Sequence, residues 1–315
     1  MDRVAAVAPP LLIALVGPTA AGKSALALGL AEAQGGEIVS CDSLQVYRGL
    51  DVGSAKPTPA ERRRVPHHLL DVVDPDEPFS AADYARRARV ALAAIRERGA
   101  APFVVGGTGL YLRALLRGLF AGPSRDEALR GRLEAMAERH GERRLHRWLA
   151  RVDPASAARI EAADRVRVVR ALEVFHKTGR PLSGHHEDGA EPLGGFTVRL
   201  LGLAPPRETL RAAVEARTDR MLAGGLVEET RGLIARYGAE VRPLQSIGYR
   251  QAVAVVRGAL GVEQARRDIV KETMRYAKRQ MTWFRHQEQV AWCADAAEAE
   301  TLAARWRLAT RRGPG

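Results

Sequence analysis

The glycine-rich stretch at residues 17–24 constrains the fold of this chain more than any other feature. It reads Gly-Pro-Thr-Ala-Ala-Gly-Lys-Ser, follows an apolar run at residues 11–16 and precedes an Ala- and Leu-rich segment at residues 25–33. A strand, a glycine loop and a helix in this order are the context of a phosphate-binding P-loop, G-x-x-x-x-G-K-[ST]. The loop amides and the start of the helix favour negative charge at one spot, so we expect a diphosphate or triphosphate ligand.

The residue types in this loop match that chemistry. Gly17 and Gly22 allow the backbone to approach a phosphate without an intervening Cβ atom. Lys23 supplies a positive charge for the terminal phosphates, and the Ser24 hydroxyl is a ligand for Mg²⁺, the cofactor that the motif predicts. The predicted diphosphate-binding residues are Gly17, Pro18, Thr19, Ala20, Ala21, Gly22, Lys23 and Ser24, and the motif alone is also compatible with ATP.

The charge balance points to an anionic partner. The chain has 49 Lys and Arg residues against 37 Asp and Glu residues, a formal net charge of +12. Nucleic acid fits this balance because phosphate contacts dominate its affinity, although a basic, solvated surface gives the same count. The only cysteines, Cys41 and Cys293, have no metal-ligand spacing, and no signal peptide or membrane span is evident, so we expect a cytoplasmic protein without a membrane partner.

Strands and helices alternate in the first part of the chain. We predict strands at residues 37–40, 102–105 and 197–203, and helices at residues 80–98 and 110–116. Strands separated by helices imply a doubly wound parallel sheet in an α/β fold with a P-loop NTPase-like core.

The sequence pattern changes near residue 121. Only helical patterns rich in arginine follow, up to a Gly- and Pro-rich bridge at residues 180–195. We therefore predict a core of residues 1–120 and 191–315 and an all-helical insertion domain at residues 121–190. The arginines of the insertion either pair with glutamates on solvated helix faces or bind RNA.

The last long helix is expected at residues 262–289. Met274, Ala277, Met281 and Phe284 recur on one face as a core stripe. Basic residues interleave with aromatic ones on another side, which suits either nucleic-acid binding or snorkelling of long side chains at a protein surface. This second set comprises Arg275, Tyr276, Lys278, Arg279 and Trp283.

Taken together, several blocks resemble the tRNA dimethylallyltransferase family of bacterial tRNA isopentenyltransferases. Besides the P-loop, the block Asp-Ser-Leu-Gln-Val-Tyr at residues 42–47 is close to diagnostic of that family. Further matching blocks lie at residues 51–57, 66–71, 105–111, 170–174, 246–250 and 276–285, in the family's order over nearly the whole chain. The chain departs from the family at residues 161–164, where only Asp164 carries over, and it has Ser24 where many members have Thr.

The resemblance implies a reaction. A dimethylallyl group moves from dimethylallyl diphosphate to the exocyclic N6 of the adenosine 3′-adjacent to the anticodon, in tRNAs that read codons beginning with U. The P-loop then holds the diphosphate of the prenyl donor instead of ATP. Asp42 is the expected base for the N6 proton, Arg217 the cation that stabilises the leaving diphosphate, and Thr108 a supporting catalytic residue. The expected partners are this donor and the tRNA anticodon stem-loop, and the expected state is a monomer.

The resemblance also implies a set of tRNA-binding residues. Those predicted are Asp42, Ser43, Leu44, Gln45, Thr108, Arg130, Val166, Arg167, Arg170, Gln245, Gly248, Tyr249, Arg250, Lys278, Arg279, Gln280, Trp283 and Arg285.

Three other functions remain open at this point. A P-loop kinase of small molecules would use ATP and could carry an arginine-rich lid, but has no counterpart of the block at residues 42–47. An adenylate isopentenyltransferase would modify free AMP, which the basic C-terminal helix disfavours. An RNA-binding NTPase switch would need an apolar strand that ends in a Mg²⁺-binding Asp, and the sequence has no evident candidate other than Asp42. Activity without nucleoside triphosphate separates these alternatives.

Overall fold

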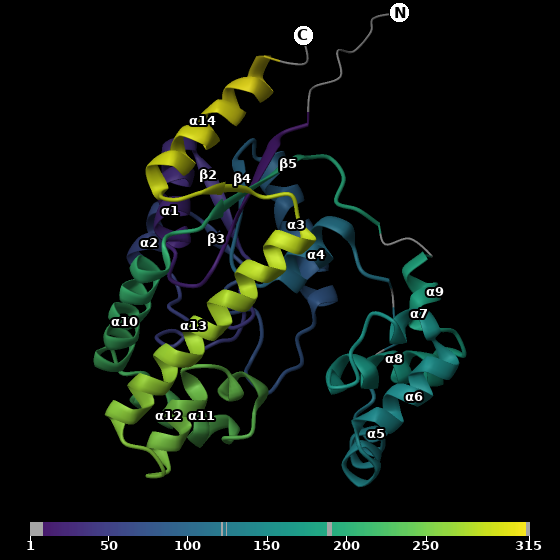
Figure 1. The fold of residues 1–315 in the computed structure, drawn as a ribbon. Helices are drawn as coiled ribbons and strands as arrows, with labels where there is room; N and C mark the ends of the chain where they lie inside the picture. Colours follow the sequence, from purple (N-terminus) through teal and green to yellow (C-terminus); the bar gives the residue numbers. More distant parts are fainter. Residues whose placement is uncertain (1–8, 121, 124, 188–190, 313–315) are drawn as a thin grey trace, which may run out of the picture. The chain divides into compact units, whose positions relative to one another are not determined.

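A computed structural model describes residues 9–120, 122–123, 125–187 and 191–312 (Figure 1). The chain divides into two compact units. The core unit comprises Met1–Leu116 and Leu193–Gly315, and the helical unit comprises Arg117–Pro192. The second unit extends a few residues beyond the insertion predicted at residues 121–190 on each side.

The core unit is built on a six-stranded sheet in which every pairing is parallel, in the order β3-β2-β4-β1-β5-β6. This confirms the predicted α/β fold. The sequence did not predict the two short edge strands, β3 and β6, because two or three residues are too few for a periodic pattern. The strands are β1 Leu11–Val16, β2 Gly36–Ser40, β3 His67–His68, β4 Ala101–Val105, β5 Thr197–Leu203 and β6 Ala291–Cys293.

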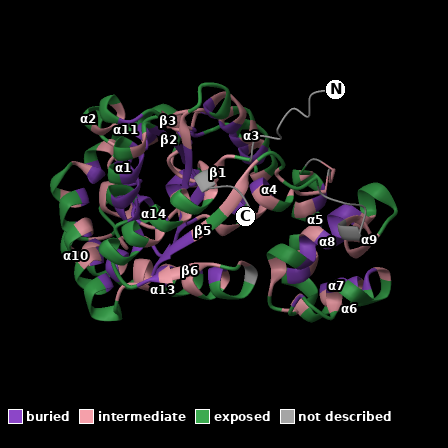
Figure 2. Ribbon diagram, turned by 90° about the horizontal axis from the view of Figure 1, so that it is seen from above, coloured by how far each residue is buried: buried purple, intermediate pink, exposed green. Residues whose placement is uncertain are grey.

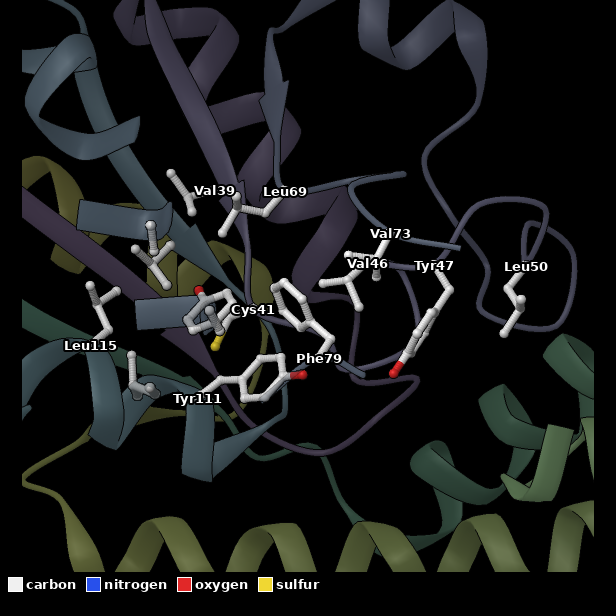
Figure 3. Packing of buried hydrophobic residues seen from close by; sticks show 14 of the residues in the cluster. Val39, Cys41, Val46, Tyr47, Leu50, Leu69, Val73, Phe79, Tyr111 and Leu115 are labelled. Carbon is white, nitrogen blue, oxygen red and sulfur yellow. The ribbon is translucent and has the colours of Figure 1, made fainter. Parts of the chain in front are cut away.

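Alternation along the strands gives the sheet two apolar faces, because successive side chains point to opposite sides. In β1, Ile13 and Leu15 pack with α1 (Lys23–Gln34) and α14 (Ala296–Arg312), whereas Leu12 and Ala14 belong to the other apolar cluster. That second cluster includes α3 (Ala81–Glu97) and α4 (Gly109–Arg117), whose Tyr84 and Tyr111 rings stack 4.4 Å apart. Figure 2 shows the burial of the strands, and Figure 3 the packing of the second cluster.

The remaining helices of the core unit follow the sheet strands or cover their ends. In α3 the Ser80 hydroxyl accepts a hydrogen bond from the Asp83 amide, the capping box that starts the predicted helix there. Within the described residues, no helix is both long and apolar enough to cross a membrane. The other elements are α2 Pro59–Arg64, α10 Arg207–Ala223, α11 Leu226–Tyr237, a 3₁₀ helix at Arg242–Gln245, α12 Tyr249–Val256 and α13 Val262–Gln287.

The predicted core stripe of α13 is half right. Ala277 and Phe284 are buried, but Met274 and Met281 are only partly buried. These two methionines line a groove with residues of α10 such as Leu210, so the apolar periodicity of α13 covers both its core face and a surface depression.

The helical unit has its own core. Leucines and valines at three- and four-residue spacing, including Leu133, Leu149 and Leu172, form its buried cluster. Asp126, Asp153 and Asp164 each cap a helix by accepting a hydrogen bond from a backbone amide of its first turn. Its helices are α5 Glu127–His140, α6 Glu142–Val152, α7 Pro154–Ala157, α8 Arg165–Thr178 and α9 Leu182–Glu187.

Candidate active site

The P-loop lies between the end of β1 at Val16 and the start of α1 at Lys23. Gly17 has φ 128°, and a Cβ atom there would lie 2.5 Å from the carbonyl oxygen of Leu203, so only glycine fits. The Lys23 side chain is buried, and its Nζ donates to the Pro18 carbonyl at 2.6 Å. The Lys23 side chain therefore folds back onto the loop, which ends at the N-terminus of α1, where an anion is favoured.

A cavity of about 970 Å³ in the core unit opens beside this loop. The carboxyl ends of three neighbouring strands meet there: β1 supplies the P-loop, β2 leads to Asp42, and β4 leads to Gly106 and Gly107. Arg217 of α10 lines the same cavity. This is the position at which open parallel sheets bind their ligands.

Two cations face the cavity without a carboxylate within ion-pair distance among the described residues. Burial, and next the neighbouring Arg217, lower the pKa of Lys23 to about 8. Burial also lowers the pKa of Arg217, whose Nη1 donates to the Thr19 hydroxyl at 3.0 Å and whose Nη2 donates to the Ser54 carbonyl at 3.3 Å. Two buried, weakly compensated cations favour an anionic ligand between them.

Asp42 is fixed by its own turn. Its Oδ1 accepts hydrogen bonds from the amides of Leu44 at 2.8 Å and Gln45 at 3.4 Å. Electrostatic attraction to Asp42 opposes the lowering of both the Lys23 and the Arg217 pKa, so this carboxylate lies near both cations. The arrangement places a proton acceptor next to an anion-binding centre.

Thr108 and Gln280 hold the loops that surround the cavity. The Thr108 hydroxyl accepts from the Ser43 amide at 3.1 Å, which ties the turn after β4 to the turn after β2. Gln280 is 6% exposed; its Oε1 accepts from the Thr19 amide and its Nε2 donates to the Gly107 carbonyl, both at 2.9 Å. Gln280 therefore bridges two loops of the site, and its contact with tRNA stays a prediction.

The cavity fits a Mg²⁺ ion that arrives with a diphosphate. Within the described residues no cluster of three or more His, Cys, Asp or Glu side chains could hold a metal by itself. Mg²⁺ needs only one or two protein oxygens when phosphates and waters complete its shell. Ser24 is exposed to the cavity that Asp42 also lines, and these two residues are the candidate ligands.

Comparison with known proteins now adds to this geometry. The family model described as IPP transferase matches residues 45–287. The chain belongs to the IPP transferase family. A tRNA dimethylallyltransferase of Koribacter versatilis is 50% identical over 90% of this chain and 92% of that protein, and one of Geobacter metallireducens is 52% identical over 89% and 91%.

Solved structures of the family share the fold. The tRNA isopentenylpyrophosphate transferase of Bacillus halodurans superposes with a TM-score of 0.69 at 37% identity, covering 96% of this chain and 98% of that one. A eukaryotic dimethylallyltransferase described as acting on tRNA gives a TM-score of 0.75 at 26% identity, covering 95% of this chain and 78% of that one.

The residues that the family resemblance assigns to tRNA differ widely in exposure within the core unit. Lys278, Arg279 and Arg285 are exposed on α13, and Arg279 lies over the Tyr276 ring at 5.6 Å. Trp283 is half-buried against Gly109. Lys278, Arg279 and Arg285 are therefore available to a ligand, and Lys278 and Arg285 line the same groove of the core unit.

The predicted tRNA-binding residues at and after the end of the 3₁₀ helix have partners within the core unit or are buried in it. Gln245 is exposed but donates to the Ala239 carbonyl at 3.0 Å, and Arg250 is exposed and pairs with Glu272. Gly248 and Tyr249 are buried, and Tyr249 is 0% exposed. Both residues belong to the core of the unit, and their contact with tRNA stays a prediction.

In the helical unit two predicted arginines are committed to an internal ion pair. Arg130 and Arg170 both donate to Glu173, which is 0% exposed. Burial alone would raise the pKa of Glu173, but hydrogen bonds from these arginines and from the Asp126 amide lower it to about 2. Both arginines therefore have a structural partner in a buried carboxylate, and their contact with tRNA stays a prediction.

The other two predicted residues of this unit lie on its surface. Val166 is 74% exposed, and Arg167 is exposed and pairs with Asp164 three residues earlier. Elsewhere in the helical unit, Arg165 pairs with Glu142, as the solvated-face alternative anticipated.

Some residues around the cavity were not predicted. Tyr276 lines it, and burial, with the Asp42 charge second, raises the pKa of its hydroxyl to about 12. Lys56, Asp71 and Glu229 support its wall. The block at residues 51–57 was a family match, which could have singled out Lys56, but no motif indicates Glu229.

Proposed function

We propose that the chain is a tRNA dimethylallyltransferase that transfers a dimethylallyl group from dimethylallyl diphosphate to N6 of the adenosine 3′-adjacent to the anticodon, in tRNAs reading codons that begin with U. The observation that carries the proposal is one cavity that combines two weakly compensated cations, Lys23 and Arg217, with the carboxylate of Asp42. Family membership supplies the reaction that such a cavity serves.

In the proposed reaction the bond between C1 of the prenyl group and the diphosphate oxygen breaks, and a bond between C1 and N6 forms. The electron pair of the broken bond leaves with the diphosphate, whose charge Lys23, Arg217 and the P-loop amides stabilise. The N6 proton passes to Asp42. Ser24, with Asp42, would hold a Mg²⁺ ion, which would supply positive charge at the diphosphate.

The acceptor adenosine must leave its stack to reach the cavity, and single-stranded loop bases do so most easily. The exposed residues Lys278, Arg279 and Arg285 provide cations for phosphates, and the half-buried Trp283 ring provides a surface for stacking. On the helical unit we propose that Val166 and Arg167 contact the anticodon stem-loop. Asp42, Lys23 and Arg217 all come from one chain, so we propose that the enzyme is a monomer. We also propose that it is cytoplasmic.

A transfer assay without ATP tests the proposal. Unmodified bulk tRNA, Mg²⁺ and labelled dimethylallyl diphosphate are incubated with the protein, and the labelled nucleoside is mapped. We expect label on the adenosine 3′-adjacent to the anticodon. Label on free AMP in preference to tRNA would identify an adenylate isopentenyltransferase. ATP consumption with small acceptors would identify a kinase.

A further inference from the structure

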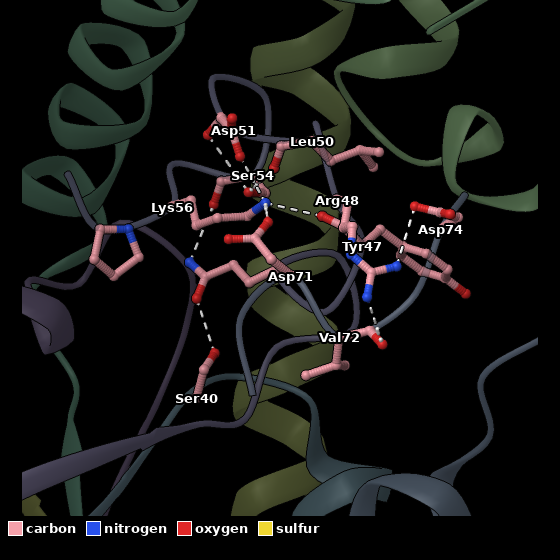
Figure 4. Close-up of polar contacts among 12 residues, drawn as sticks. Ser40, Tyr47, Arg48, Leu50, Asp51, Ser54, Lys56, Asp71, Val72 and Asp74 are labelled. Carbon is pink, nitrogen blue, oxygen red and sulfur yellow. Dashed lines mark hydrogen bonds and ion pairs between the residues drawn. The ribbon is translucent and has the colours of Figure 1, made fainter. Parts of the chain in front are cut away.

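The loop at residues 51–57 forms part of the cavity wall and is anchored from two sides. Figure 4 shows the polar contacts on one of them. The Lys56 side chain is 1% exposed, and its Nζ donates to the Tyr47 carbonyl at 2.8 Å and to the carboxylates of Asp51 and Asp71 at 2.6 Å each. All three donors of this ammonium are therefore used in closing the loop.

The second anchor is Glu229 of α11. Its carboxylate accepts hydrogen bonds from three successive amides, those of Asp51 at 3.0 Å, Val52 at 2.7 Å and Gly53 at 3.2 Å. The buried Tyr249 hydroxyl donates to the same carboxylate at 2.6 Å. Four donors on one carboxylate fix both its position and that of the backbone segment it binds.

Packing reinforces this second anchor. A Cβ atom on Gly53 would lie 2.5 Å from the Tyr249 ring, so the ring fills the space that a side chain at this position would need. Tyr249 therefore contacts the loop twice, through its ring at Gly53 and through Glu229. Its 0% exposure leaves no surface for a nucleic acid.

The anchored loop delivers two carbonyl groups to the site. The Ser54 carbonyl accepts from Arg217 Nη2 at 3.3 Å. The Ser54 and Ala55 carbonyls also lie 3.4 and 3.3 Å from Gln45 Nε2. The guanidinium of Arg217 is thus held between Thr19 of the P-loop and Ser54 of this loop. If the loop is displaced, the Ser54 carbonyl moves with it and the Arg217 donors change direction.

We infer that Glu229, Tyr249 and Lys56 are positioning residues that orient Arg217 towards the diphosphate through the loop at residues 51–57. The inference rests on the proposed function for its kinetic readout. It assigns Tyr249 to the architecture of the diphosphate site and not to tRNA recognition. None of the three residues touches the reacting atoms.

Three substitutions test the inference in the full chain. Tyr249→Phe keeps the ring and removes only the hydroxyl, Glu229→Ala removes the carboxylate, and Lys56→Met removes the ammonium at similar length. We expect kcat for prenyl transfer to fall about 10-fold in Tyr249→Phe and about 10²-fold in Glu229→Ala, because small misplacements of a catalytic group have effects of this size. The dissociation constant for tRNA should stay within about twofold of the wild-type value in both variants. Glu228→Gln, an exposed neighbour on the same helix, is the matched control.

A double-mutant cycle separates positioning from general destabilisation. In an Arg217→Lys background, where the forked guanidinium is already absent, Glu229→Ala should lower kcat by less than about threefold further. Independent, multiplying effects would overturn the inference, as would weakened tRNA binding at unchanged kcat. If Lys56→Met or Glu229→Ala does not fold, Tyr249→Phe and Glu229→Gln carry the same test.

The affinity for inorganic diphosphate gives a readout that does not depend on prenyl transfer. Calorimetric titration should show about 10-fold weaker binding in Glu229→Ala and unchanged binding in Glu228→Gln. A wild-type protein that binds diphosphate but transfers no prenyl group would refute the proposed reaction alone. Equal diphosphate affinity and equal Arg217 dependence in wild type and Glu229→Ala would refute the positioning role.

Discussion

The core cavity and the helical unit use arginine in opposite ways. In the cavity, the hydrogen-bond partners of Arg217 among the described residues are a hydroxyl and a carbonyl, and burial lowers its pKa. In the helical unit, Arg130 donates to the buried Glu173, and this carboxylate raises the Arg130 pKa. Among the described residues, Arg217 has no carboxylate within ion-pair distance, whereas Arg130 has the buried carboxylate of Glu173.

The difference teaches how to separate a binding cation from a structural one. A buried cation without a carboxylate is costly unless a ligand provides the missing charge, whereas a buried pair is satisfied without any ligand. By this criterion Lys23 and Arg217 are binding cations, whereas Arg130 and Arg170 are structural ones. Arg130 joins α5 to Glu173 of α8, and Arg170 pairs with the same carboxylate within α8.

The largest effect is expected from Asp42→Asn. Asparagine still accepts from the amides of Leu44 and Gln45, so the turn is kept, but the amide cannot take the N6 proton. We expect kcat to fall about 10²- to 10⁴-fold with tRNA affinity unchanged. Single-turnover transfer and filter binding measure the two quantities, and a fully active variant would remove Asp42 from the mechanism.

Arg217→Ala should come next, with a loss in kcat of about 10²- to 10³-fold, since it removes donors aimed at developing negative charge. Arg211→Ala on the same helix is the matched control, because Arg211 is exposed and pairs with Glu215. Steady-state transfer rates compare the two. Equal transfer rates in Arg217→Ala and Arg211→Ala would show that the arginine in the cavity contributes no more to catalysis than the exposed, paired one.

Glu173→Ala tests the other side of the comparison. Leaving Arg130 and Arg170 without their buried partner should destabilise the helical unit by about 3–5 kcal/mol. Hydrogen exchange within residues 125–187 measures this loss. Glu138→Gln is the control, because Glu138 is exposed and 3.6 Å from Arg165.

The pH dependence has a definite sign. The folded pKa of Glu173, about 2, lies below its ordinary value of 4.5, so its contribution is complete above pH 4.5 and is lost as the pH falls towards 2. The stability difference between wild type and Glu173→Gln should therefore narrow over this range. A constant difference would contradict a charged role for Glu173.

The smallest effect is expected from Lys278→Ala combined with Arg279→Ala. Each lost phosphate contact should reduce the slope of log affinity for tRNA against log salt by about one. Arg63→Ala with Arg86→Ala removes two exposed charges elsewhere on the core unit and should leave the slope unchanged. Identical slopes in both double variants would leave α13 as an ordinary solvated helix.

Local patterns predicted much of the fold. The P-loop, the helix predicted at residues 80–98 and the strand at Thr197–Leu203 each rest on neighbouring residues, and the structure has all three. The edge strands β3 and β6 depend on pairing with distant strands, which no local pattern encodes.

The site was predictable where a motif marks it and not where tertiary contacts decide. Asp42, Lys23 and Arg217 converge as expected because the strand order brings the ends of β1 and β2 to one edge. The family resemblance assigns Tyr249 and Arg130 to tRNA, and no local pattern indicates that they are buried. Their burial follows from Glu229 and Glu173, which lie 20 and 43 residues away in sequence.

The charge state of Lys23 tests the central claim most directly. Its pKa of about 8 in the free protein should rise when a diphosphate supplies the missing negative charge. Calorimetry of dimethylallyl diphosphate binding at about pH 9, in two buffers of different ionisation enthalpy, should then show net proton uptake that disappears in Lys23→Met. Binding without proton uptake, or the same uptake in Lys23→Met, would contradict the claim that this cavity is an anion site short of charge.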